Sequence, residues 1–276
     1  MLAAQRQALI LAQVGRDGAV RVSDLVDQLQ VSDMTIRRDL DALARRGLVE
    51  KVHGGATAVP TASAVEPGFE AKSQQETSAK GVIAAEVARM VGPGDAVALT
   101  AGTTTWAVAE RLVAVPNLTV VTNSVPVADA FHHHGRPDQT VVLTGGVRTP
   151  SGALVGPVAV HALRFLHIDL LFMGVHGMHS RYGFTTPNLL ECQTNQAFIE
   201  AAARLVVVAD HTKWGTVGLS TIADLDAAHV LVSDEGLAEE HRAELSDRVG
   251  ELIIAAGDPA SEEQTAADRA VAAHPP

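Results

Sequence analysis

The sequence predicts an α/β protein with a small helical module at its amino end and a larger, mostly parallel sheet domain after it. Residues 1–57 show apolar side chains at helical spacing, interrupted by short loops and followed by a hairpin-like segment. From about residue 96 onward, short β-branched runs alternate with helix-like segments. That alternation is typical of a parallel sheet covered by helices on both faces.

The most informative stretch of the module is residues 31–40, which read VSDMTIRRDL. Ser32 suits the cap of a helix, because its hydroxyl can accept a bond from a backbone N–H one turn further in. Ile36, Leu40 and Leu43 recur at helical spacing and predict one buried stripe. The opposite face carries hydroxyl and guanidinium groups, which can bond base edges and phosphates in a DNA major groove. We therefore predict DNA contacts from Ser32, Asp33, Met34, Thr35, Arg37 and Arg38.

The segments around this stretch complete the order of a helix-turn-helix module with a wing. Residues 3–14 and 22–29 both have helical periodicity, and a tight turn leads from the second into the stretch described above. Residues 48–56, LVEKVHGGA, have the pattern of a β-hairpin. Lys51 and His53 lie on this predicted wing, and we add them to the predicted DNA-binding residues.

The motif VSDMTIRRDLDAL, followed by GLVEKVHGGA, resembles the winged helix of the DeoR family of bacterial transcriptional regulators. The resemblance is close over residues 3–57 and continues more weakly to about residue 254. It implies a double-stranded DNA operator as partner. It also implies a second domain that senses a sugar phosphate and is related in fold to ribose-5-phosphate isomerase and the coenzyme A transferases. A family member of this kind is expected to repress carbohydrate-metabolism genes.

Charge differs between the two parts of the chain. Residues 1–57 hold eight Lys and Arg against seven Asp and Glu, a net charge of +1, whereas all 276 residues carry −11. A nearly neutral module binds DNA modestly, which favours a homodimer or homotetramer that reads repeated half-sites. The chain has a single cysteine and no apolar run of membrane-spanning length, so we expect a cytoplasmic protein with no membrane partner.

We predict four segments. Residues 1–57 form the winged helix-turn-helix DNA-binding domain, and residues 58–72, which are small and contain prolines, form a linker. Residues 73–255 form the effector-sensing α/β domain. Residues 256–276 are acidic, rich in alanine and poor in large apolar side chains, so we expect a disordered tail.

Within the larger domain, apolar periodicity and β-branched runs place each element in order. We expect helices at residues 73–91, 104–113, 125–133, 158–166 and 189–204. We expect strands at residues 96–99, 118–121, 141–143, 168–173, 205–209, 230–232 and 252–254.

Three loops follow predicted strands, which is where open α/β sheets bind ligands. In the first loop, Gly-Thr-Thr-Thr, the glycine lets the backbone approach an anion and the start of the next helix offers unpaired N–H groups. A plain N-cap turn is the alternative for this first loop. The second loop, Thr-Asn-Ser, is equally compatible with a turn and a serine cap, and the third, Gly-Gly, is by itself compatible with a simple turn. The predicted effector contacts from these loops are Gly102, Thr103, Thr104, Thr105, Thr122, Asn123, Ser124, Gly145 and Gly146.

Asp210 and Lys213 follow another strand-like run, LVVVA. Lysine can meet a phosphate, and aspartate can accept sugar hydroxyls or anchor the lysine; a surface ion pair is the alternative. The family resemblance places a phosphorylated sugar or related metabolite near this pair and near the Gly-Thr-Thr and Thr-Asn-Ser loops. Thr100 stands where the family often has an acidic residue, and Asn195 stands where it commonly has lysine. These departures imply a different effector or another set of contacts.

The alternative function is a sugar-phosphate isomerase that carries a DNA-binding module, with Asp169 as base and Lys213 as stabilising cation. Neither their spacing nor their context favours it, and we expect no catalytic residue. Histidines 132–134, or His176 with His179, can chelate a metal. Because no cysteine or clear carboxylate accompanies them, we expect ordinary exposed histidines, no metal and no cofactor.

Overall fold

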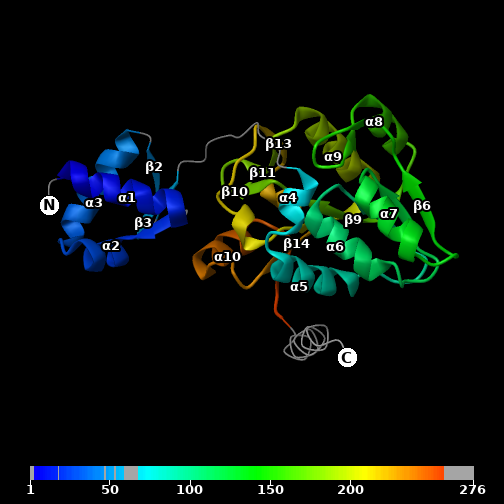
Figure 1. Cartoon of the computed structure of the whole chain (residues 1–276), viewed down its shortest axis with the longest axis horizontal. Helices are drawn as coiled ribbons and strands as arrows, with labels where there is room; N and C mark the ends of the chain where they lie inside the picture. The colour runs from blue at the N-terminus through cyan, green and yellow to red at the C-terminus, as the bar shows by residue number, and fades with distance from the viewer. Residues whose placement is uncertain (1–2, 18, 47, 53, 59–67, 258–276) are drawn as a thin grey trace, which may run out of the picture. The chain divides into compact units, whose positions relative to one another are not determined.

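The computed structural model describes residues 3–17, 19–46, 48–52, 54–58 and 68–257 (Figure 1). The chain divides into two compact units, Met1–Thr61 and Ala62–Pro276. The predicted wing residue His53 lies outside the described residues, and so does most of the predicted linker and tail.

The first unit combines three helices with a three-stranded antiparallel sheet in the order β1-β3-β2. The stripe predicted from helical spacing forms its core, where Ile36, Leu40 and Leu43 are buried. The winged helix-turn-helix fold is therefore confirmed. Strand β1 was not predicted, because three residues are too few to show an alternating pattern. The elements are α1 (Ala3–Asp17), β1 (Ala19–Arg21), α2 (Val22–Leu29), α3 (Asp33–Arg45), β2 (Val49–Val52) and β3 (Gly55–Ala58).

The two glycines of the wing explain how its hairpin joins the sheet. Gly54 lies in the turn between β2 and β3 with φ of +79°, a conformation that a residue without Cβ adopts at little cost. A Cβ on Gly55 would lie 2.1 Å from the carbonyl oxygen of Val20. Glycine at this position therefore allows β3 to pair closely with β1.

The second unit is built on a seven-stranded sheet in the order β15-β14-β12-β9-β4-β5-β6. Every neighbouring pair in it is parallel, which confirms the predicted mostly parallel α/β domain. The strands are β4 (Ala96–Leu99), β5 (Thr119–Thr122), β6 (Thr140–Leu143), β9 (Ile168–Gly174), β12 (Ala202–Val208), β14 (Val230–Asp234) and β15 (Leu252–Ala255).

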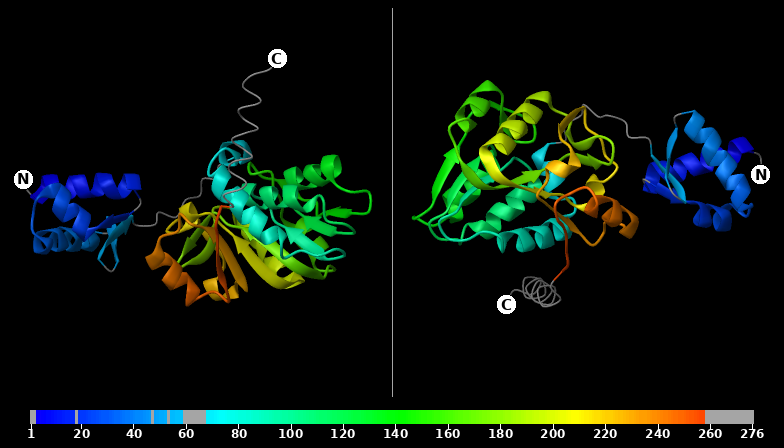
Figure 2. Two further views of the ribbon diagram at one scale, coloured as in Figure 1. Left: turned by 90° about the horizontal axis from the view of Figure 1, so that it is seen from below. Right: turned by 180° about the vertical axis from the view of Figure 1, so that it is seen from behind.

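Helices cover both faces of this sheet (Figures 1 and 2). One face packs a core with α5 (Thr77–Ala88), α6 (Thr103–Leu112) and α7 (Val125–His134). The other face packs against α8 (Pro157–Leu163) and α9 (Leu189–Ala201). That second core also takes in a small antiparallel sheet made of β10 (Gly177–His179), β11 (Gly183–Thr186) and β13 (Ser220–Ala223). No helix in the described ranges is long and apolar enough to cross a membrane.

Three predicted helices of the second unit differ from the structure by three or more residues at one end, and one of them, α8, ends at residue 163 rather than 166. In place of one helix over residues 73–91 there are two, α4 (Phe69–Ser73) and α5, and α4 begins inside the segment predicted as linker. Glu76 separates them with a φ of +49°, which a continuing helix does not allow. Helix α9 ends at residue 201 rather than 204, because Ala202 already pairs with β9 as the first residue of β12.

The short elements of the second unit were not predicted. They are β7 (Val147–Arg148), β8 (Leu154–Val155), β10, β11, β13, α10 (Glu239–Ser246) and the 3-10 turns η1 (His211–Lys213) and η2 (Leu225–Ala227).

The strand order reverses between β4 and β9. The chain proceeds outward from β4 through β5 to β6, then returns to β9 and continues to β12 on the other side. In open α/β sheets, the crevice at the carboxyl ends of the strands beside such a reversal is the usual ligand site. The loops after β4, β9 and β12 therefore meet at one edge of the sheet.

Candidate nucleic-acid interface and anion pocket

Helix α3 presents its predicted face to solvent within the first unit. Ser32 caps the helix, since its Oγ accepts the Thr35 backbone N–H at 3.3 Å and lies 2.9 Å from the Thr35 hydroxyl. Met34 is 61% exposed, and both Arg37 and Arg38 are exposed. Their side chains are therefore available to a groove.

The two arginines of α3 are in different electrostatic states. Arg37 donates two hydrogen bonds to Asp33, from Nε at 2.5 Å and from Nη2 at 3.2 Å. The hydrogen bond to Asp33 raises the pKa of Arg37, with the Coulomb attraction of the pair adding to it. Within the described residues, no ion pair joins Arg38 to a carboxylate. Arg38 therefore offers the less neutralised charge.

Lys51 connects the wing to the same helix. Its Nζ lies 2.5 Å from Asp41 Oδ1, and this hydrogen bond lowers the pKa of the Asp41 carboxyl. Both side chains are about half exposed, so the pair orients Lys51 more than it stabilises the fold.

Sequence reasoning missed the residues that hold α3 in place. Arg6 on α1 is buried and donates from Nε to Asp39 Oδ2 at 2.5 Å, and Gln7 donates to the other oxygen of Asp39 at 3.0 Å. A charged residue at a core position of the helix was the signal that this pair offered in the sequence.

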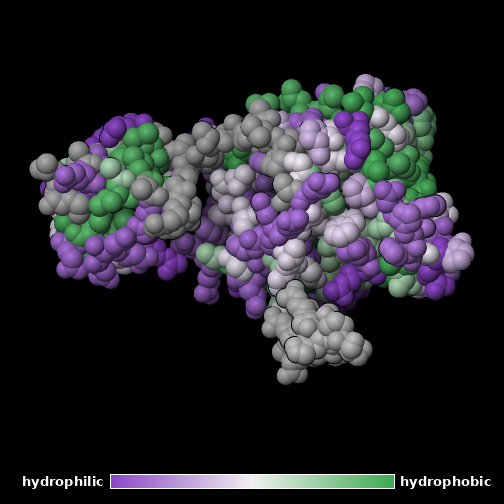
Figure 3. All heavy atoms as spheres, in the orientation of Figure 1, coloured by the Kyte–Doolittle hydropathy of each residue, from purple (hydrophilic) through white to green (hydrophobic). Residues whose placement is uncertain are grey.

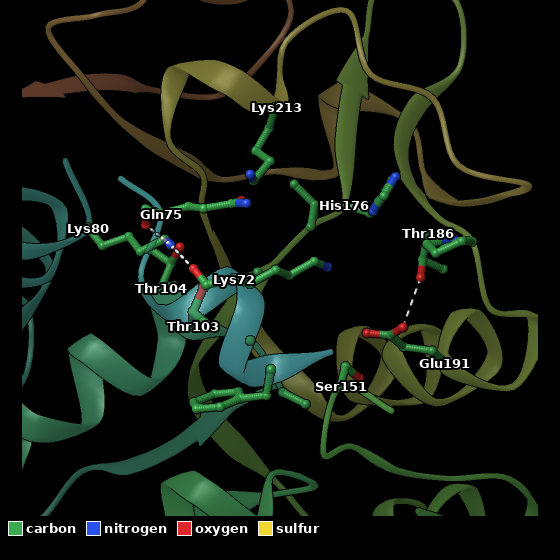
Figure 4. Close-up of a pocket in the computed structure, with 16 residues that line it drawn as sticks. Lys72, Gln75, Lys80, Thr103, Thr104, Ser151, His176, Thr186, Glu191 and Lys213 are labelled. Carbon is green, nitrogen blue, oxygen red and sulfur yellow. Dashed lines mark hydrogen bonds between the residues drawn. The ribbon is translucent and has the colours of Figure 1, made fainter. Parts of the chain in front are cut away.

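The second unit has a pocket at the sheet edge where β4, β9 and β12 end (Figure 4). Of the predicted effector residues, Gly102, Thr103, Thr104 and Lys213 line it. The other residues around it are Phe69, Lys72, Gln75, Lys80, Ala101, Ser151, Gly174, Val175, His176, Thr186, Pro187 and Glu191.

Lysines are concentrated around this pocket, although the chain as a whole is acidic. Residues 62–276 contain three lysines, Lys72, Lys80 and Lys213, and all three line this pocket. The first turn of α6 begins there too, and its N–H groups add positive potential. In Figure 4 the carboxylate of Glu191 lies on the other side of the pocket, bonded by the Thr186 hydroxyl at 3.0 Å. One side of the pocket therefore suits an anion, and the other suits hydroxyl groups.

Asp210 anchors Lys213. The carboxylate is fully buried, and its Oδ1 accepts the Thr212 backbone N–H at 3.1 Å and the Thr212 hydroxyl. Its Oδ2 accepts no hydrogen bond within the described residues, but Lys213 Nζ lies 3.4 Å away. Asp210 does not line the pocket itself, but it lies beside the side chain of Lys213, which does.

Four other predicted effector residues lie just behind the pocket wall. Thr105 is buried and donates to the carbonyl of Thr100 at 2.6 Å. Thr122 donates to the carbonyl of Leu99, and Ser124 caps α7. Asn123 is fully buried and accepts the Ala101 N–H at 2.9 Å while donating to Leu154 O. These hydroxyl and amide groups hold the loop before α6, but they do not line the pocket.

Gly145 and Gly146 form the turn that leads into β7, with φ of +74° and +125°. A Cβ on Gly146 would lie 2.5 Å from the carbonyl oxygen of Val155, so this glycine allows close pairing with β8. Neither glycine lines the pocket.

The two residues that depart from the family pattern, Thr100 and Asn195, are also buried. Thr100 is buried, and its hydroxyl accepts the Gly174 N–H at 3.1 Å. Asn195 is 2% exposed, and its Oδ1 accepts no hydrogen bond within the described residues. Neither side chain lines the pocket, so any effect on ligand choice passes through the residues around it.

The residues that the alternative isomerase needs are not brought together. Asp169 is the second residue of β9, and its Oδ2 accepts the Ala96 N–H at the start of β4. Lys213 follows the carboxyl end of β12. Because β9 and β12 are parallel neighbours, Asp169 lies at the end of the sheet where the strands begin, and Lys213 lies at the end where they finish. In the described ranges, no group of three His, Cys, Asp or Glu side chains has the geometry of a metal site.

A winged-helix unit followed by a unit with an anion pocket defines the class of ligand-responsive DNA-binding proteins. A family model of the DeoR-like helix-turn-helix domain matches residues 6–62, and one of the DeoR C terminal sensor domain matches residues 75–235. The chain belongs to the DeoR family, as its resemblance predicted, and is a DNA-binding transcriptional regulator with a small-molecule sensor domain.

Curated relatives span nearly the whole chain. The uncharacterized HTH-type transcriptional regulator FruR of Bacillus subtilis is 33% identical, covering 85% of this chain and 92% of that protein. The HTH-type transcriptional regulator GlpR of Haloferax volcanii is 35% identical, covering 89% and 95%. The glycerol-3-phosphate regulon repressor of Escherichia coli is 33% identical, covering 82% and 89%.

Among solved structures, a ribose 5-phosphate isomerase A from Methanocaldococcus jannaschii is similar with a TM-score of 0.38 at 14% identity. The match covers 51% of this chain and 55% of that one. The chain thus spans about half the length of this isomerase. So distant a likeness does not bear on the activity of this protein.

Proposed function

We propose that this protein represses carbohydrate-metabolism genes and that a phosphorylated sugar or related metabolite, bound in the anion pocket, modulates its affinity for the operator. The observation that supports this most is that Lys72, Lys80 and Lys213 line one pocket together with the start of α6. Lysine ammonium groups and helix N-termini both favour phosphate. The name of one relative, the glycerol-3-phosphate regulon repressor, agrees with such a ligand.

The proposed ligand has two chemically distinct ends. Its phosphate lies against Thr103 and Thr104, where hydroxyls and backbone N–H groups meet the lysines. Its hydroxyl groups face Glu191 and Thr186, whose oxygens can accept and donate hydrogen bonds. We infer no catalytic role for these residues, because Asp169, the base of the alternative isomerase function, does not line this pocket.

The proposed DNA contact is made by the first turns of α3 in a major groove. Arg37 and Arg38 are exposed there, and Lys51 lies on the wing beside the same helix. The contacts proposed at Ser32, Asp33, Met34 and Thr35 follow from the capped start of the helix. The protein is proposed to act in the cytoplasm.

We also propose that the protein forms a homodimer, alone or within a homotetramer, through the edge strand β6. Val141 and Leu143 on this strand are exposed, and no described strand pairs with its outer edge. Unpaired edges are normally protected by charge or proline, and β6 has neither. A second copy, related by a two-fold axis, can pair with this edge in antiparallel fashion.

The surface beside β6 also suits contact with a second copy of this chain, because it is apolar and lacks acidic residues. Val147, Val158 and Phe165 are 62–71% exposed, and Figure 3 shows hydrophobic residues gathered over α8 and β6. Residues 139–168 contain no Asp or Glu, although the whole chain has 32. Two acidic copies can therefore approach here without the repulsion expected elsewhere on their surfaces.

The proposed function is tested on a duplex selected by this protein from random DNA. Glycerol 3-phosphate, ribose 5-phosphate, fructose 1-phosphate and glucosamine 6-phosphate are titrated in, each beside its unphosphorylated parent. We expect at least one phosphorylated compound to change the operator Kd by about tenfold, a typical allosteric coupling. Lys213→Met is expected to abolish this response, and Arg89→Met, which removes an exposed arginine directly after α5, is the control. If phosphorylated and free sugars act alike, the proposal is wrong.

A further inference from the structure

Lys80 links the anion pocket to helix α4. Its Nζ donates a hydrogen bond to the Lys72 carbonyl at 2.7 Å and another to the Gln75 carbonyl (Figure 4). Both carbonyls belong to the end of α4 or the turn after it, and the Lys72 carbonyl also accepts the Gln75 backbone N–H at 3.2 Å. Lys80 therefore fastens the carboxyl end of α4 to α5.

Among the described elements, α6 makes the main further contact with α4. The helix has five residues, and an isolated helix of that length does not persist in water. Phe69 at its start contacts the Trp106 ring of α6 edge-to-face, with ring centroids 6.0 Å apart. Short elements held by few contacts are the ones that open at low free-energy cost.

Lys80 has one more donor to offer. An ammonium group carries three N–H donors, and the two carbonyl bonds use two of them. Lys80 also lines the anion pocket together with Thr103 and Thr104. A phosphate at the start of α6 can therefore accept the third N–H while the bonds to α4 remain in place.

We propose that Lys80 and α4 couple the ligand to the DNA-binding unit: an anionic ligand that bonds Lys80 and contacts Lys72 tightens α4 against α6. This inference rests on the proposed function. Helix α4 is the first described helix after the winged-helix unit, so its docking fixes the position of the described residues that lie nearest to that unit in the sequence. Ligand binding and α4 docking then favour each other through one shared side chain, which is a coupling free energy between two sites.

The burial of Lys80 supports this mutual stabilisation of ligand binding and α4 docking. Desolvation lowers the pKa of Lys80, while the nearby Asp210 opposes that change. An anion in the pocket acts in the same direction as Asp210 and stabilises the protonated ammonium. The protonated form is the one with all three donors, so the ligand strengthens the group that holds α4.

Hydrogen exchange tests the proposal on the full-length wild-type protein. Exchange of the amides of residues 68–76 is measured with and without inorganic phosphate, and with and without glycerol 3-phosphate. We expect a bound anion to slow exchange in this segment by about tenfold, because its local opening becomes less favourable. The amides of α10, another short helix outside the pocket, are the internal control and are expected to keep their rates.

Two variants separate Lys80 from a general loss of charge. Lys80→Met removes the donors to α4 and is expected to speed exchange of residues 68–76 by about tenfold even without ligand. Arg89→Met removes a cation from the end of the same helix, where Arg89 pairs with Glu86, and is expected to leave that rate unchanged. The wild-type measurement stands on its own if Lys80→Met does not fold.

The outcomes distinguish this proposal from the one it rests on. If a phosphorylated probe raises the Tm and changes operator affinity while residues 68–76 exchange at the same rate, the coupling through α4 is wrong and the proposed function stands. If no probe changes either the Tm or operator affinity, the proposed function fails and the coupling fails with it. Slower exchange together with an altered operator affinity supports both.

Discussion

Arg6 and Asp39 form a buried ion pair, with Nε 2.5 Å from Oδ2, that fastens α1 to the helix proposed to enter DNA. The side chains are 10% and 5% exposed. Gln7 bonds the second oxygen of the same carboxylate at 3.0 Å. Because Asp39 lies between the exposed Arg38 and the buried Leu40, this pair sets the rotation of α3 about its axis.

Asp39→Asn is expected to destabilise the winged-helix unit by about 3 kcal/mol, because it removes the negative charge from a buried ion pair with Arg6. The measurement is urea unfolding followed by circular dichroism and by exchange of the α1 amides. Asp33→Asn is the matched control on the same helix; its pair with Arg37 is more than half exposed and contributes little. Equal destabilisation by the two variants would show that the Arg6–Asp39 pair has no special role.

Arg38→Ala is expected to weaken operator binding by about 1–3 kcal/mol if Arg38 reads a base edge, and to relax specificity at one position of the site. If Arg38 instead contacts phosphate, affinity falls for all sequences alike and the salt dependence becomes shallower. Binding to the selected duplex and to single-base variants at several salt concentrations separates these cases. Arg89→Ala, in the second unit, is the control, and an Arg38→Ala protein with unchanged affinity would contradict a DNA contact at this residue.

The recognition helix and the sheet were predictable because each depends on a pattern within a continuous segment. Ser32 and the stripe of Ile36, Leu40 and Leu43 form a cap and one face of a single helix, so their spacing is visible in the sequence. The alternation of strands and helices likewise predicted the parallel sheet. Short elements such as α4 carry too few residues for a period, and they were missed for that reason.

The pocket was predictable only in part, because segments far apart in the sequence build it. Gly102 and Lys213 could be identified, since each follows a buried strand. Lys72 and Lys80 could not, because one lies in the predicted linker and the other within a predicted helix, away from any strand end. Their rarity was the available signal: the chain has four lysines, and only Lys51 lies outside residues 62–276.

The free energy of unfolding is expected to rise with pH in the alkaline range because of Lys80. Burial lowers the pKa of Lys80 below its ordinary value of 10.5, so the folded protein releases this proton before the unfolded chain does. Where the unfolded chain binds more protons, stability increases with pH, here from the lowered pKa up to 10.5. Denaturant unfolding across this range measures the slope. The charged groups near Lys80 are Asp210, Lys213, Glu76 and Lys72.

Comparison with Lys80→Met isolates that contribution, because the other titrating groups are common to both proteins. The variant is expected to lack the Lys80 part of the rise. Phosphate is expected to move the rise to higher pH, since an anion beside the ammonium opposes its loss of a proton. Identical slopes in the two proteins would mean that Lys80 titrates normally in the folded state.

Leu143→Lys is expected to convert the assembled protein to a smaller species. Leu143 is 43% exposed on β6, and a lysine there places two like charges against each other across a two-fold axis and hinders pairing of the edge. Light scattering after size-exclusion chromatography measures the mass. Leu219→Lys is the control, because Leu219 is 52% exposed on a segment away from β6. Operator affinity should fall with the mass, since a single nearly neutral winged helix then binds one half-site alone. A Leu143→Lys protein with unchanged mass would place the interface elsewhere on the molecule.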